Sequence, residues 1–194
     1  IKELGIKISE IVENNFRGTG LFNPLKKEAF VQKPDIAHLK PRFEDWRLIK
    51  AQALITGKLL IKDEKLKVEF RLWDLAASKE MTALAFTTTP SNWRRVAHII
   101  SDKIYERLTG EEGYFDTRIV YVSESGTQRD RIKRLAIMDQ DGGNHKYLTD
   151  GKSLVLTPRF SPNQQQITFF SYSGIKAGLK PSVYLYNLSF QTLP

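Results

Sequence analysis

A repeat of 48 to 49 residues in the second half of the chain constrains the fold more than any other feature. Arg118–Ser123 corresponds to Gln166–Ser171 at a spacing of 48. A second set of corresponding residues follows at a spacing of 49: Leu135 with Tyr184, and Ile137 with Tyr186. Because each pair has the same phase in a two-residue alternation, the repeat predicts strands with one apolar face.

A β-rich repeat of this length is typical of propeller blades, which recur every about 40–50 residues with four strands each. The stretch Thr157–Asn163 reads as a strand end followed by a Ser-Pro-Asn turn into the strand Gln166–Ser171. Pro162 fixes φ at the second turn position, and Asn163 is expected to adopt the αL or bridge conformation that closes the reversal. The chain after Gly113 therefore predicts roughly one and a half blades of an incomplete all-β propeller segment.

The first part of the chain predicts an α/β domain with two amphipathic helices on a mixed sheet. The first helix carries an apolar stripe and ends at Gly18 and Gly20, and the second begins after Ser91 as N-cap and stops at Thr109-Gly110. Between the two helices the spacing of apolar residues changes from the helical period of 3.6 to the strand period of two. The expected intervening elements are a short strand at Leu21–Pro24, a short helix at Phe43–Lys50, and strands at Ala53–Ile61, Leu66–Trp73 and Met81–Thr87.

The cleanest alternation lies in Leu66–Trp73, where apolar and charged residues follow one another. A sheet with one buried and one wet face produces that pattern, so Lys67 and Glu69 should face solvent. The apolar residues expected in the core are Leu66, Val68, Phe70 and Leu72. Everything after Glu111–Asp116 is strand and turn, which divides the chain into residues 1–113 and residues 114–194.

Charge and composition exclude several classes of protein. The net charge is +8, with no cysteine, so disulfides and thiolate metal sites are excluded. Residues 1–113 carry 20 basic and 16 acidic side chains and residues 114–194 carry 10 and 6, so each part contributes +4. Nucleic-acid-binding proteins usually concentrate their positive charge on one face. We therefore expect no nucleic-acid partner.

The residues offer little for catalysis or cofactor binding, and we predict no catalytic, cofactor-binding or metal-binding residues. His38, His98 and His145 lack paired ligand spacing, and His98 is expected to be a packed side chain on a helix. No phosphate-binding loop or dinucleotide fingerprint occurs. Asp139–Gly142 opens like a calcium loop, but the later ligand positions do not fit, and Asp-Gly between two strands predicts a hairpin turn instead.

A candidate partner-binding site lies where the chain enters the predicted innermost blade strand, at Lys152–Thr157. In a propeller this strand lines the central channel, and loops at the channel mouth commonly hold a peptide or a partner protein. A solvent-exposed connection without a partner is the alternative. The candidate residues are Lys152, Ser153, Leu154 and Thr157.

Several motifs together resemble the TolB family, periplasmic propeller proteins of the bacterial Tol–Pal system. The matching segments run in family order over nearly the whole chain: Gly18–Leu25, Asn92–His98, Leu108–Gly110, Thr117–Val122, the Asp139–Gly142 turn with Asn144, and the Ser-Pro-Asn turn. Family members begin with a secretion signal and a further strand, and a six-bladed propeller would continue well beyond residue 194. The chain is therefore interpreted as a fragment, whose uncovered faces should expose Phe169, Phe170, Tyr184 and Tyr186.

The resemblance implies a non-enzymatic periplasmic adaptor that is peripheral to membranes through its partners only. It implies binding of the lipoprotein Pal at the propeller, contact with inner-membrane Tol proteins such as TolA through the amino-terminal region, and a role in outer-membrane integrity and cell division. Two alternatives remain open on sequence alone. They are the propeller domain of a peptidase, which requires a hydrolase sequence after residue 194, and a basic nucleic-acid-binding α/β module, which requires salt-sensitive binding.

Overall fold

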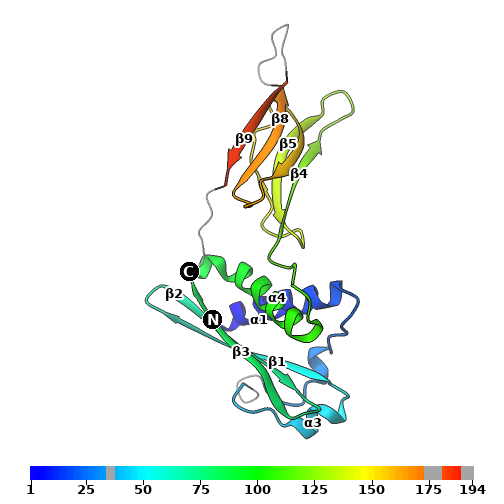
Figure 1. Ribbon diagram of the computed structural model, residues 1–194, viewed down its shortest axis with the longest axis vertical. Helices are drawn as coiled ribbons and strands as arrows, with labels where there is room; N and C mark the ends of the chain where they lie inside the picture. The colour runs from blue at the N-terminus through cyan, green and yellow to red at the C-terminus, as the bar shows by residue number, and fades with distance from the viewer. Residues whose placement is uncertain (34–37, 173–180, 189–194) are drawn as a thin grey trace. The chain divides into compact units, whose positions relative to one another are not determined.

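The computed structural model describes residues 1–33, 38–172 and 181–188. The chain divides into two compact units, here called the amino-terminal unit (Ile1–Asp116) and the carboxy-terminal unit (Thr117–Pro194). Helices and one sheet build the first, and strands and turns alone build the described part of the second (Figure 1). The predicted fold class, an amino-terminal domain of helices on a sheet followed by an incomplete all-β propeller segment, is confirmed. The structural division falls after Asp116, three residues beyond the boundary drawn at Gly113 in the sequence.

The amino-terminal unit has a helical layer over one face of an antiparallel sheet (Figure 1). Its long helices are α1 (Lys2–Gly18) and α4 (Trp93–Thr109), which pack against each other and against the sheet. The shorter helices are η1 (Lys27–Ala29), α3 (Phe43–Leu48) and η2 (Pro90–Asn92). The strands are β1 (Ala53–Lys62), β2 (Lys65–Asp74) and β3 (Lys79–Thr88), in the order β1-β2-β3.

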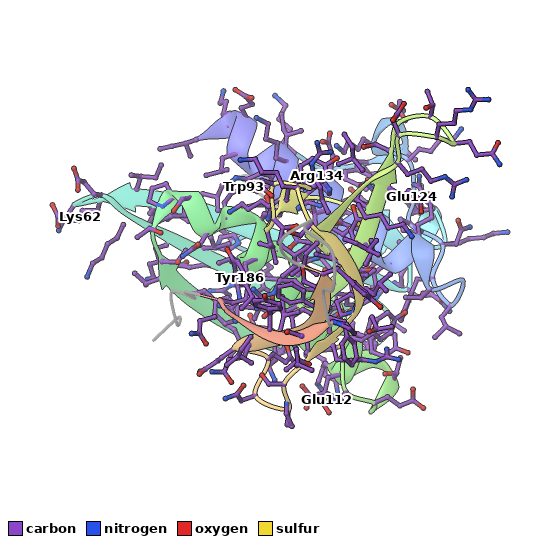
Figure 2. All side chains as sticks on the ribbon, turned by 90° about the horizontal axis from the view of Figure 1, so that it is seen from above. Lys62, Trp93, Glu112, Glu124, Arg134 and Tyr186 are labelled. Carbon is purple, nitrogen blue, oxygen red and sulfur yellow. The ribbon has the colours of Figure 1, made fainter. Side chains whose placement is uncertain are left out.

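The predicted register of the central strand is confirmed. Its four alternating apolar residues are each no more than 2% exposed: Leu66, Val68, Phe70 and Leu72. They join a core with the apolar stripes of α1 and α4, which include Ile8, Phe16, Val96, Ile100 and Ile104. The opposite face carries charged side chains, and Lys67 pairs there with Glu69 at 2.7 Å. At the end of β1, Lys62 projects from the tip of the β1–β2 hairpin (Figure 2).

Three local expectations for this unit were wrong. The sheet is antiparallel rather than mixed in the described residues, and Leu21–Pro24 forms no strand. Phe22 instead packs its ring against Phe16, with ring centroids 5.0 Å apart. This aromatic contact stabilises the segment without strand pairing. Ser91 does not cap α4, because it lies inside the 3-10 turn η2 and the helix begins after Asn92.

The carboxy-terminal unit contains two three-stranded antiparallel sheets, in the orders β4-β5-β6 and β7-β8-β9. The first comprises β4 (Arg118–Ser125), β5 (Ile132–Asp139) and β6 (Lys146–Tyr147). The second comprises β7 (Leu154–Phe160), β8 (Gln166–Tyr172) and β9 (Ser182–Asn187). The 48-residue repeat pairs β4 with β8 and β5 with β9, so in the described part of the chain the first sheet has no counterpart of β7.

The two sheets of this unit share one core, because β7 lies against β4 and β5. Its buried residues are Leu135, Ile137, Val155, Ile167 and Phe169. The expectation of four exposed aromatic rings is therefore half correct. Phe170 and Tyr184 are 44% and 37% exposed, whereas Phe169 is 8% exposed and Tyr186 packs against the core. Phe169 lies on the opposite strand face from Phe170, as alternation along a strand requires.

The Ser-Pro-Asn turn forms as predicted between β7 and β8, but with a different residue in the left-handed region. The positive φ of 56° belongs to Gln164 rather than to Asn163. The Asn163 carboxamide oxygen accepts hydrogen bonds from the Ser161 hydroxyl at 2.6 Å and the Gln165 N–H at 3.1 Å. Asn163 thus closes the turn through its side chain.

A buried histidine in the amino-terminal unit gives a prediction for pH dependence. His38 is 7% exposed, with its Nε2 4.0 Å from the Glu69 carboxylate. Burial lowers its pKa, the charges of Arg71 and Lys58 lower it further, and Glu69 partly opposes them. Below the ordinary histidine pKa of about 6.5 the unfolded chain therefore binds more protons than the folded unit. Stability is lost as the pH falls through 6.5 toward the lowered value.

We expect His38→Gln to reduce the loss of unfolding free energy between pH 7 and pH 5. The difference in slope is at most about 1.4 kcal/mol per pH unit, since one proton is involved. All three tryptophans lie in residues 1–116, so their fluorescence in urea reports on this unit. His145→Gln in the other unit is the control. An unchanged pH slope for His38→Gln would show that His38 is not the titrating group.

Candidate functional site

The connection from β6 to β7 is held by backbone and side-chain hydrogen bonds. The Asp150 carboxylate accepts the Lys152 N–H at 3.0 Å, and this bond is the main cause of the lowered pKa of Asp150. Arg134 Nε donates to the Asp150 carbonyl at 3.3 Å, and the Leu135 N–H donates to the Thr149 hydroxyl at 2.9 Å. The connection is therefore attached to β5 before the chain enters β7.

The four candidate residues are spread along this entry rather than gathered at one point. The Lys152 side chain is 87% exposed, with its ammonium group 3.5 Å from Asp150. Ser153 is half-buried, and Leu154, the first residue of β7, is 41% exposed. Thr157 lies further along β7 at a register shift, where the pairing with β8 is interrupted between Leu156 and Arg159.

Thr157 has an unusual backbone conformation, with φ at 46°. A β-branched residue in this region is a genuine outlier, and the following Pro158 restricts its conformation further. The interrupted pairing after Leu156 is the reason why the strand can accommodate it. Such outliers cluster at functional positions, because surrounding structure must hold them in place.

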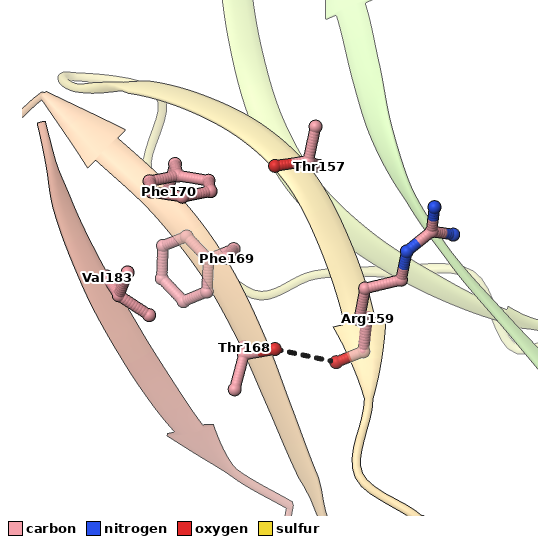
Figure 3. Close-up of a pocket in the computed structure, with 6 residues that line it drawn as sticks. All are labelled: Thr157, Arg159, Thr168, Phe169, Phe170 and Val183. Carbon is pink, nitrogen blue, oxygen red and sulfur yellow. Dashed lines mark hydrogen bonds between the residues drawn. The ribbon is translucent and has the colours of Figure 1, made fainter.

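Thr157 borders an open pocket of about 350 Å³ across the second sheet (Figure 3). The pocket is lined by residues of three neighbouring strands: Thr157 and Arg159 of β7, Thr168, Phe169 and Phe170 of β8, and Val183 of β9. Figure 3 shows the Thr168 hydroxyl bonded to the Arg159 carbonyl, at 3.4 Å. The apolar side chains of Phe169, Phe170 and Val183 suit an apolar side chain of a partner.

Of the predicted site residues, only Thr157 reaches this pocket. The other lining residues were not predicted as site residues, because they lie on strands whose neighbours cannot be assigned from one repeat. The exposed apolar character of Phe170 and Val183, at opposite positions of β8 and β9, is the signal that could have indicated them. Asp139–Gly142 forms the predicted turn, in which Asp139 accepts from the Asn144 amide at 2.8 Å and Asp141 from the Gly143 N–H at 3.0 Å.

The two units define a β-propeller protein with an α/β amino-terminal domain. A family profile described as the TolB amino-terminal domain matches residues 2–81, and one described as the TolB beta propeller domain matches residues 105–193. The chain belongs to the TolB family.

Two relatives support this assignment. The chain is 71% identical over 171 residues to the Tol-Pal system protein TolB of Pelagibacter ubique (strain HTCC1062), covering 88% of this chain and 38% of the relative. It superposes on the crystal structure of TolB from Acinetobacter baumannii with a TM-score of 0.80 at 25% identity, covering 94% of this chain and 44% of that one. The chain thus spans about two fifths of the length of these relatives. Among the residues that the structure describes, no helix is long and apolar enough to cross a membrane.

A matched pair of glycine substitutions tests the connection into β7. Gly151 and Gly142 have nearly equal positive φ angles, 85° and 84°. A Cβ at Gly151 would lie 2.5 Å from Ile132 Cγ2, whereas a Cβ at Gly142 would meet nothing within 4 Å. We expect Gly142→Ala to cost about 1 kcal/mol of backbone strain. Gly151→Ala should cost about 1–3 kcal/mol more, because it also overpacks.

The measurement is thermal unfolding of the carboxy-terminal unit by circular dichroism, with tryptophan fluorescence monitoring the other unit separately. Equal destabilisation by the two substitutions would show that the Gly151 connection is not packed against β5 as described.

Proposed function

We propose that the chain is part of a non-enzymatic periplasmic adaptor of the Tol–Pal system. Its carboxy-terminal unit binds the lipoprotein Pal, and its amino-terminal region contacts inner-membrane Tol proteins such as TolA. Through these contacts the protein supports outer-membrane integrity and cell division. The observation that carries the proposal is 71% identity to a Tol-Pal system TolB over 88% of the chain.

The entry into β7 is the proposed docking surface on the carboxy-terminal unit. Lys152 offers an exposed cation, Leu154 an exposed apolar side chain, and Thr157 the edge of the pocket. Exposed apolar anchors beside a charge are what a partner protein uses to gain both affinity and orientation. The strained conformation of Thr157 supports this assignment, because a backbone φ of 46° favours glycine over a β-branched residue.

Binding of soluble Pal to the full-length protein tests the proposal. Lys152→Glu should weaken binding by a few-fold, as expected for a charge at an interface rim, and the loss should shrink at high salt. Thr157→Trp should place a bulky side chain at the β7 entry and weaken binding by about tenfold or more. Lys146→Glu reverses another exposed charge, on β6, and serves as the control.

Isothermal titration calorimetry gives the affinities, and circular dichroism verifies that each variant is folded. Pal affinity unchanged in both variants would move the site away from the β7 entry. Failure of the wild-type protein to bind Pal at all would refute the adaptor proposal itself.

A further inference from the structure

The segment after α4 doubles back onto that helix instead of leaving the amino-terminal unit. The helix stops at Gly110, with φ at 79°, and the chain then passes beside Asp102. A Cβ at Gly113 would lie 2.4 Å from the Asp102 Cα, so the backbone approaches the helix as closely as a glycine allows. Phe115 is 2% exposed and packs its ring edge-on against Tyr105, with centroids 5.8 Å apart.

Asp102 attaches this segment through both carboxylate oxygens. Its Oδ1 accepts the Phe115 N–H at 2.6 Å, and its Oδ2 accepts the Asp116 N–H at 3.0 Å. Asp116 in turn pairs with Arg95 Nε at 3.1 Å, and Arg95 lies about two turns of α4 before Asp102. Burial raises the pKa of Asp102 although both backbone bonds oppose the shift. A partly desolvated carboxylate is retained here because two N–H groups satisfy it.

The next residue is already fixed to the other unit. The Thr117 carbonyl accepts the Gln140 N–H at 3.1 Å, and Arg118 pairs with Asp139 at the start of β4. Consecutive residues, Asp116 and Thr117, are therefore held by different units. No residue separates the two units, so only the backbone dihedral angles of Asp116 and Thr117 allow one unit to turn relative to the other.

We propose that Asp102 is a clasp that sets the length of the connection between the two units. With the clasp closed, rotation between the units is confined to the Asp116–Thr117 bond region. With the clasp open, the six residues after Gly110 become connecting chain, which can span roughly 20 Å when extended. Asp102 is a positioning residue, because it limits the length of the connection by holding the Phe115 and Asp116 backbone amides.

Two variants of the full-length protein open the clasp in different ways. Asp102→Asn keeps the side-chain size but leaves one acceptor oxygen for two N–H groups. Gly113→Ala leaves the carboxylate intact and displaces the segment by steric overlap. Glu106→Gln, an exposed side chain on the same helix that pairs with Lys103, is the control.

The direct readout is hydrogen exchange at the Phe115 and Asp116 amides. We expect exchange there to accelerate about tenfold or more in both clasp variants and not in the control, since each amide loses a charge-assisted bond. Cleavage by a glutamate-specific protease after Glu111 or Glu112 should accelerate in parallel; Glu112 is exposed (Figure 2). Spin labels at the exposed positions Glu44 and Lys146 should give a broader distance distribution.

A role in stability alone predicts a different result. It predicts a lower unfolding midpoint by tryptophan fluorescence, with no broadening of the distance distribution under conditions where the variants are folded. That outcome would overturn the proposal, as would wild-type Phe115 and Asp116 amides that exchange as fast as an unstructured chain.

Discussion

Burial of one face of β2 is the interaction on which the amino-terminal unit depends. Four side chains of this strand, from Leu66 to Leu72, are almost inaccessible to water, and each contributes about 1.5–3 kcal/mol relative to exposure. The surface ion pairs around them contribute about 0–1 kcal/mol each. Because β2 is paired on both sides, its register also fixes that of β1 and β3, and α1 and α4 must cover the same face. The clasp at Asp102 then adds the Gly113–Asp116 segment to this core.

In the carboxy-terminal unit, burial covers only one face of the strands β8 and β9. Its sheets cover each other's inner faces, whereas Phe170, Val183 and Leu185 on the outer face of β8 and β9 are 44%, 65% and 54% exposed. A propeller blade contacts neighbours on both faces, so this outer surface is one that a further blade would cover in a closed propeller. The pocket beside Thr157 opens on the same sheet. Its accessibility to a partner therefore depends on the whole propeller, which is why the binding experiment uses the full-length protein.

The sequence predicted what periodicity and repetition determine, and it missed what long-range packing decides. Strands β1 to β3 and the end of α4 at Gly110 follow from alternation and from a glycine with positive φ. The prediction of a strand at Leu21–Pro24 was wrong because Phe22 packs against Phe16 and Tyr105, and neighbouring residues in the sequence do not reveal that contact. Thr157 was predicted as a site residue for its place before the innermost strand. The strain at Thr157 and the approach of Val183 depend on strand pairing that sequence alone does not provide.

The chain consists of two units with separate cores, and Asp116 and Thr117 join them with no connecting residues between. Hydrogen exchange measured across a urea series tests it most directly, because it resolves which amides open together. We expect two groups of protected amides, each losing protection at its own urea concentration: one in the amino-terminal unit that includes Phe115, and one in strands β4 to β9. A single midpoint shared by all protected amides, or Phe115 opening with the second group, would contradict it.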